Sequence, residues 1–177
     1  MAGSWEVRNH SSVLCATLHT DNVTIAWAYG LRNLQIPGPP PIAVAGMPYD
    51  MARNACCMAA LERGVDYIFF LASDVIPPSD AILRLLAHGK PIISGMYCRR
   101  SPPHAVPVAI KGGQWVVNPP ANQVIEVDVV GCGCLLVSRE VLEALPPLDP
   151  KRGKHWFDWR VDMKGLLPEG EAMSEDF

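Results

Sequence analysis

Polar residues in this sequence gather where apolar runs end, and one carboxylate among them could bind a metal. Residues 67–71 (Tyr-Ile-Phe-Phe-Leu) form a continuous apolar run, and Ala72, Ser73 and Asp74 follow it directly. A hard divalent cation such as Mg²⁺ or Mn²⁺ prefers oxygen ligands, and it needs few protein ligands when it also bridges a diphosphate. Asp74 is therefore the first candidate metal ligand. The alternative is that Asp74 only caps the turn before the Pro-Pro pair that follows.

Other polar groups follow apolar runs of the same kind. His19 and Asp21 come after residues 12–18, and an Arg-Arg pair lies beyond residues 91–95. In an open parallel sheet, ligands bind beyond the carboxyl ends of the strands, so these groups would converge with Asp74. The apolar runs therefore predict one site, built from loops at a single edge of a sheet.

The elements that would position this site alternate between strand and helix patterns in the first half of the chain. Apolar residues at helical spacing occupy residues 23–34, 50–63 and 79–88, between the strand-type runs. This repeat predicts a Rossmann-like three-layer α/β/α sandwich with a mostly parallel sheet. The second half holds short strand patterns joined by Gly-Gly and Asn-Pro-Pro turns, which predict a small antiparallel extension.

Length and charge limit the kinds of protein that the sequence can encode. A chain of 177 residues suits one domain with a sizeable core, and hydrophobic residues make up 49% of it, as in compact globular proteins. The formal net charge is -3, and the charges are dispersed. We expect no nucleic-acid partner, because neutralising phosphates would need a concentrated basic face.

The cysteines and the apolar segments bear on the cellular location. The six cysteines are Cys15, Cys56, Cys57, Cys98, Cys132 and Cys134. Most lie inside apolar runs and none is in a Cys-X-X-Cys pair, so we expect reduced, structural thiols and a cytoplasmic protein. No window reaches the roughly 18 apolar residues of a membrane span, and the start of the chain lacks the apolar stretch of a signal peptide.

Five short motifs occur in a fixed order along the chain. They are residues 51–54, 64–74, 91–97, 130–139 and 174–177. In this order and spacing the motifs resemble glycosyltransferases of the A fold, most closely the small family-2-like enzymes found in phage and bacterial genomes. The resemblance covers about residues 12–177, nearly the whole chain.

The resemblance implies an activity and an organisation. It implies a metal-dependent, inverting transfer of a sugar from a nucleotide-diphosphate sugar, with UDP as the first expectation, to a hydroxyl of a glycan or other acceptor. The cofactor would be Mn²⁺ or Mg²⁺. The chain would form a single glycosyltransferase domain over residues 1–177, with a nucleotide-binding half at about 12–100 and a sugar and acceptor half at about 101–177.

The resemblance also implies roles for individual residues. Asp74 matches the last aspartate of the family's Asp-X-Asp motif, which coordinates the metal on the diphosphate. Asp176 matches the base that deprotonates the acceptor hydroxyl, and Glu175 its neighbour. The positions expected near the nucleotide are Thr17, His19, Asp21, Arg53 and Ser73. The strand segment expected beside the donor sugar is Gly131, Cys132 and Gly133.

Two departures from the family pattern keep other functions open. Ala72 stands where the motif has its first aspartate, and family members normally continue beyond the Glu-Asp motif with a helix and often a metal-binding histidine. We therefore expect a trimmed or minimal domain, in which His155 is a candidate replacement ligand or else a packing or acceptor contact. The main alternative is a catalytically degenerate module that binds a nucleotide sugar or a glycan. A nucleotidyltransferase is a third option, but the Gly-rich loop that it needs after the first strand is absent.

Overall fold

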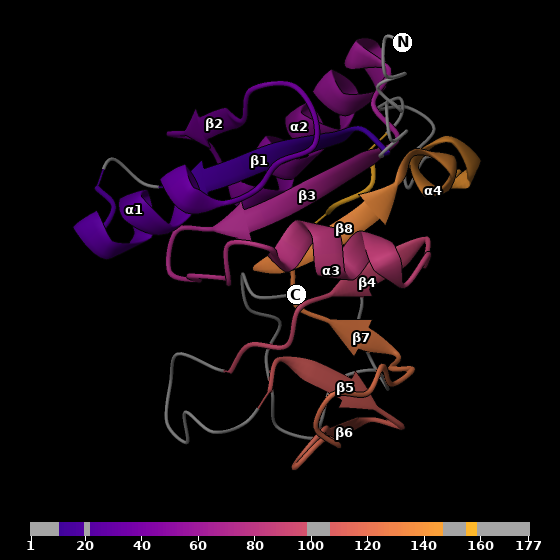
Figure 1. The fold of residues 1–177 in the computed structure, drawn as a ribbon. Coiled ribbons are helices and arrows are strands. Elements are labelled where there is room, and N and C mark those ends of the chain that lie inside the picture. Colours follow the sequence, from indigo (N-terminus) through magenta and orange to yellow (C-terminus); the bar gives the residue numbers. More distant parts are fainter. Residues whose placement is uncertain (1–10, 20–21, 99–106, 147–154, 159–177) are drawn as a thin grey trace, which may run out of the picture.

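The computed structural model describes residues 11–19, 22–98, 107–146 and 155–158, and Figure 1 gives their arrangement. In chain order the elements are β1 (Val13–His19), α1 (Ile25–Asn33), β2 (Ile42–Ala45), α2 (Tyr49–Arg63), β3 (Tyr67–Ala72), α3 (Ala81–Ala87), β4 (Ile92–Ser94), β5 (Ala109–Lys111), β6 (Gln114–Trp115), β7 (Val129–Val130), β8 (Cys134–Ser138) and α4 (Arg139–Ala144). None of the helices in this part of the chain has the length and apolar content needed to cross a bilayer.

The main sheet is mixed. Its strand order is β2-β1-β3-β8-β4; β1 runs parallel to β2 and β3, whereas β8 runs antiparallel to both β3 and β4. The prediction of a Rossmann-like three-layer α/β/α sandwich with a mostly parallel sheet is therefore wrong. The physical reason is that β8, which comes near the end of the described chain, lies between β3 and β4. A fully buried apolar run does not indicate whether the strand runs parallel or antiparallel to its neighbours.

A second sheet has three antiparallel strands in the order β6-β5-β7. It lies beyond β4 in Figure 1. The amide of Val108 donates to the carbonyl of Tyr97 (2.9 Å), and the amide of Gly131 donates to the carbonyl of Val108 (3.1 Å). These bonds tie the small sheet to the segment after β4 and to the segment that leads into β8.

Two apolar cores lie on opposite faces of the main sheet. Phe70, with Ala52 and Cys56 of α2 and Leu142 of α4, belongs to one core. Its neighbour Phe69, with residues of α1 and α3, belongs to the other. Because successive side chains of a strand point to opposite faces, a strand covered on both faces reads as a continuous apolar run. This accounts for the unbroken run of β3.

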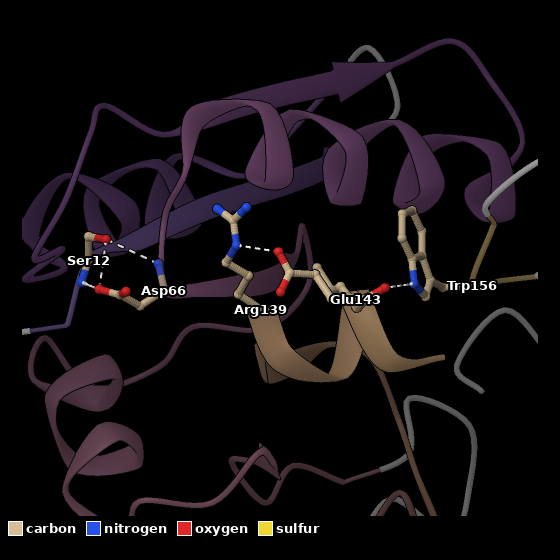
Figure 2. Close-up of polar contacts among 6 residues, drawn as sticks. Ser12, Asp66, Arg139, Glu143 and Trp156 are labelled. Atoms are coloured by element: carbon tan, nitrogen blue, oxygen red, sulfur yellow. Dashed lines mark hydrogen bonds and ion pairs between the residues drawn. The ribbon is translucent and has the colours of Figure 1, made fainter. Parts of the chain in front are cut away.

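A reciprocal contact joins the starts of β1 and β3, at the end of the sheet opposite the predicted site. Oδ2 of Asp66 accepts from the amide (2.7 Å) and from Oγ (3.0 Å) of Ser12, and the amide of Asp66 donates to Oγ of Ser12 (3.1 Å). The carbonyl of Asp66 accepts from the amide of Arg139 (2.8 Å), just after β8. Figure 2 shows the Ser12–Asp66 pair and, further along, the Arg139–Glu143 pair. Asp66 thus holds three neighbouring strands in register.

We predict that Asp66→Ala lowers the free energy of unfolding by about 1–2 kcal/mol, because it removes the acceptor of two hydrogen bonds and leaves the Ser12 hydroxyl without its acceptor. Urea unfolding followed by tryptophan fluorescence measures the change. Asp80→Ala is the matched control, since it removes only the exposed ion pair with Arg84 (2.8 Å) and should cost well under about 1 kcal/mol. Equal losses in the two variants would contradict the role given to Asp66.

Candidate functional site

The predicted site lies at the edge of the main sheet where β1, β3 and β4 end. Because β8 is antiparallel to β3 and β4, its beginning lies at this same edge. The amide of Ala72 donates to the carbonyl of Gly133 (3.0 Å), and the amide of Gly95 donates to the carbonyl of Cys134 (2.9 Å). The loop that carries Asp74 and the Gly131–Gly133 strand segment, far apart in the sequence, are therefore hydrogen-bonded neighbours.

The residues predicted near the nucleotide are in several environments. Thr17 is buried in β1, and its Oγ1 donates to the carbonyl of Ile42 (3.1 Å), so its hydroxyl links β1 to β2. His19 ends β1, and Ser73 follows β3 in a half-buried position. Asp21 lies outside the described residues, as do Glu175 and Asp176.

A hollow of about 370 Å³ opens where β1 and β2 end and α2 begins. Its lining residues are Leu18, His19, Val44, Gly46, Met47, Pro48, Tyr49 and Ala52. Most of these side chains are apolar, and one is aromatic. The hollow therefore suits a flat ring that carries a few polar atoms.

A larger cavity of about 500 Å³ begins at Asp74 and extends along α3. Its lining residues are Asp74, Val75, Ile76, Pro77, Pro78, Ala81, Arg84, Leu85, Gly95, Met96, Tyr97, Cys98, Val108 and Cys134. Asp74 is exposed, so its carboxylate can meet a ligand from solvent. The sheet edge thus has one hollow beside β2 and one beside β4, with the Asp74 loop lining the second.

Arg53 is buried in α2, with 7% of its surface exposed. Its guanidinium carbon lies 5.6 Å from the centre of the Tyr49 ring and 5.7 Å from the centre of the Phe157 ring. A cation between two aromatic faces is stabilised electrostatically, more so when water is excluded. Arg53 therefore joins the wall of the 370 Å³ hollow, where Tyr49 lies, to the segment of residues 155–158.

Asn54 clamps that segment onto α2. Its Oδ1 accepts from the amides of Trp156 (2.7 Å) and Phe157 (3.1 Å), and its Nδ2 donates to the carbonyl of Phe157 (2.7 Å). Nε1 of Trp156 donates to the carbonyl of Leu142 in α4 (2.9 Å), a contact drawn in Figure 2. The Phe157 ring meets Phe70 edge-on at 5.5 Å. Nothing in the sequence around Asn54 indicates this role, because its partners lie about a hundred residues away.

His155, a candidate metal ligand, is packed into the same segment. It is 8% exposed, and its Nε2 lies 3.7 Å from Oδ2 of Asp158. Across the described ranges, no group of three or more His, Cys, Asp and Glu side chains is arranged to hold a metal ion. The described residues therefore offer Asp74 as an oxygen ligand at the sheet edge, but no complete protein-built metal centre.

Tyr97 closes over the strand segment predicted to lie beside the donor sugar. The amide of Gly133 donates to the Tyr97 hydroxyl (2.8 Å), and a Cβ on Gly133 would lie 2.7 Å from Cζ of the Tyr97 ring. Gly133 thus permits close packing by another part of the protein. Cys132 is buried in the core beside α2. Sequence reasoning missed Tyr97 as a contact of Gly133.

The cysteines differ sharply in exposure. All six lie in the described part of the chain, and Cys98 is the exposed one. Burial raises the pKa of Cys15 from its ordinary value of 9.0 to about 12, and that of Cys134 to about 11. Burial likewise raises the pKa of Cys56 to about 11, and it raises the pKa of Cys57 further.

We predict that native protein at about pH 8.5 has one thiol that reacts readily with a disulfide reagent, whereas the unfolded chain has six. The buried thiols whose pKa is raised stay protonated at that pH, and they are out of reach of the reagent. Cys98→Ser should abolish the fast reaction. A second fast thiol in that variant would contradict the burial described here.

We predict that Asn54→Ala destabilises the protein by about 1–3 kcal/mol, because it leaves two amides and a carbonyl of the 155–158 segment without their partner. Hydrogen exchange at the Trp156 and Phe157 amides should accelerate. Asn54→Asp is the matched variant: it keeps an acceptor for both amides and loses only the donor to Phe157. It should therefore retain part of the protection, and full protection in Asn54→Ala would contradict the clamp.

Comparisons with known proteins show similarity to solved structures. No protein-family model matches the chain, and no curated protein matches its sequence. The crystal structure of A197 from STIV matches with a TM-score of 0.53 and 15% sequence identity, over 76% of this chain and 69% of A197. At this identity the likeness extends to the fold alone.

Proposed function

We propose that this protein is a metal-dependent glycosyltransferase that moves a sugar from a nucleotide-diphosphate sugar, UDP-linked in the first instance, to a hydroxyl of a glycan or other acceptor. The observation that carries the proposal is the hydrogen bond between the Ala72 amide and the Gly133 carbonyl (3.0 Å). It joins the Asp74 loop to the glycine-containing strand segment. The resemblance of the five ordered motifs to glycosyltransferases implies that the diphosphate lies at the first of these parts and the sugar at the second.

The donor would extend along the sheet edge. Its nucleobase would enter the 370 Å³ hollow beside His19 and Tyr49, where an aromatic wall and apolar contacts favour a flat ring. Thr17 and Arg53 would support the walls of this hollow, with Ser73 and Asp21 nearer the ribose and phosphates. The sugar would then lie towards Gly131, Cys132 and Gly133.

Asp74 would hold the Mn²⁺ or Mg²⁺ ion, with the diphosphate supplying most of the other oxygens. An exposed carboxylate fits a hard cation of this kind, and the described residues form no group of three or more His, Cys, Asp and Glu side chains that could hold the ion without the diphosphate. The ion would supply charge neutralisation of the leaving diphosphate. His155 is buried beside Asp158 in the segment clamped to α2, and neither of the two hollows at the sheet edge is lined by it.

The proton transfer is assigned to the end of the chain. Asp176, with Glu175 beside it, would take the proton from the incoming acceptor hydroxyl as that oxygen attacks the anomeric carbon and the diphosphate leaves. A single displacement of this kind inverts the configuration at that carbon. The assignment rests on the sequence motif, and the free thiols, typical of a reducing compartment, support a cytoplasmic site of action.

A second candidate is a module that binds a nucleotide sugar or a glycan without turnover, and the surroundings of Ala72 favour it. The carbonyl of Ala72 accepts from Nε1 of Trp27 (2.8 Å), and its amide donates to Gly133. This position is thus fixed by α1 and β8 but has no carboxylate to share the metal with Asp74.

We predict that a nucleoside diphosphate plus Mn²⁺ stabilises the protein by about 2.7 kcal/mol at a hundredfold excess over its dissociation constant. Asp74→Asn should abolish the metal-dependent part of this effect. Asp80→Asn removes a carboxylate in the following turn and should leave it intact. Thermal unfolding with UDP, GDP, CDP and ADP, with and without the ion, measures the stabilisation of the wild-type protein and of the two variants. An undiminished metal-dependent shift in Asp74→Asn would exclude Asp74 as the ligand.

Turnover separates the two candidates. The enzyme releases UDP from a UDP-sugar in an Asp176-dependent manner, whereas the binding module gives the thermal shift with no release. Asp176→Asn should keep the thermal shift and lose the release.

A further inference from the structure

A cavity of about 500 Å³ lies beside α3, and the proposed donor has no assigned place in it. It lies within the range of about 300–1,000 Å³ that is typical of small-molecule sites. Its inner wall is built by buried residues: Ala81 and Leu85 of α3, Val108 before β5, and Cys134 of β8. The cavity is therefore a defined space between rigid elements.

The described residues of the cavity wall are mostly uncharged. The charged residues that line the cavity are Asp74 and Arg84, and Nε of Arg84 is engaged by Oδ2 of Asp80 at 2.8 Å. A diphosphate would need cationic partners along its length, and the other lining residues in the described part of the chain are uncharged. The occupant that fits is an apolar group of a ligand whose polar end lies at Asp74.

The mouth of the cavity is also apolar. Ile76 is 54% exposed and Met96 is 70% exposed, and both line the cavity. Ile76 is held in place against α1, since a Cβ on Gly30 would lie 2.9 Å from its Cγ2. Two large apolar side chains exposed at the rim of one cavity form a contact surface for an apolar ligand.

The cavity adjoins the strand segment assigned to the donor sugar. Tyr97 lines the cavity, and its hydroxyl accepts the Gly133 amide at 2.8 Å, so a single side chain separates the cavity from the segment assigned to the donor sugar. Asp74 lines the cavity as well. A ligand that fills this space would therefore extend to the point where the sugar is proposed to be transferred.

We propose that the cavity binds the apolar group of the acceptor, so that the acceptor joins a hydroxyl-bearing end to an aryl or alkyl moiety and is not a free oligosaccharide. The identification of the ligand as an acceptor rests on the proposed glycosyl transfer. The expectation of an apolar group rests on the lining of the cavity alone. Met96 and Ile76 cover the apolar group at the mouth, and Asp74 faces the polar end.

Cys98 gives a direct measure of occupancy, because it is exposed and lines the cavity. The test measures its alkylation by iodoacetamide, with peptide mass spectrometry, in the presence of 4-nitrophenyl β-D-glucopyranoside or methyl β-D-glucopyranoside. At about four times the dissociation constant, mass action leaves about a fifth of the sites open, so the aryl glucoside should slow alkylation about fivefold. The methyl glucoside, which lacks the apolar group, should leave the rate unchanged at the same concentration.

A matched pair of variants locates the site. Met96→Glu places a charge at the mouth and should raise the aryl glucoside concentration needed for protection by about tenfold or more, which is 1.4 kcal/mol per tenfold. Met58→Glu makes the same change at an exposed methionine of α2, away from the cavity, and should leave protection intact. Each rate is compared with that of the same variant without ligand, and thermal unfolding checks that both variants fold.

The outcomes are distinct. No protection by the aryl glucoside, equal protection by the methyl glucoside, or equal loss in the two variants would each overturn the proposal. The measurement needs no donor, so these results leave glycosyl transfer untouched. Conversely, Cys98 protection in a protein that shows no nucleotide-dependent stabilisation would support the apolar site and overturn its description as an acceptor site.

Discussion

The antiparallel pairing of β8 with both β3 and β4 decides what the sheet edge contains. Had β8 run parallel to its neighbours, Ser138 and the start of α4 would stand at this edge. Instead Gly133 and Cys134 stand there, bonded to Ala72 and Gly95. The backbone bonds that complete the sheet therefore also bring the Asp74 loop, the segment after β4 and the segment before β8 into contact. The contact between the Asp74 loop and the strand segment assigned to the donor sugar depends on this pairing.

Local sequence patterns predicted the elements better than their assembly. The apolar run at residues 67–71 lies within β3, and the helical spacing at residues 50–63 lies within α2. Both could be predicted because the order of apolar and polar side chains reflects which faces of an element are buried. The direction of β8 cannot be predicted in this way. Cys134 and Leu136 belong to one core and Leu135 and Val137 to the other, and a strand of either direction would show the same alternation. The prediction of a mostly parallel sheet is wrong for that reason.

The candidate site divides in the same way. Asp74 could be placed at a sheet edge, because a polar residue after a buried strand needs no knowledge of distant partners. The roles of Asn54 and Tyr97 could not be predicted, because each depends on backbone groups that come close only in the folded chain. Asn54 binds the backbone of Trp156 and Phe157, and Tyr97 accepts from the amide of Gly133. Arg53 has its ring partner in Tyr49 nearby but acquires Phe157 only through the Asn54 clamp.

The two hollows at the edge differ in what they can bind, and the difference gives a direction to the proposed reaction. The one beside β2 is lined by His19 and Tyr49 and is joined through Arg53 to the 155–158 segment. The one beside β4 is lined by the exposed apolar side chains of Ile76 and Met96 and by the exposed carboxylate of Asp74. A polar, anionic donor and a partly apolar acceptor would enter from opposite sides and meet beside Asp74. Tyr97, whose hydroxyl accepts from the Gly133 amide, lies between the cavity beside β4 and the strand segment assigned to the donor sugar.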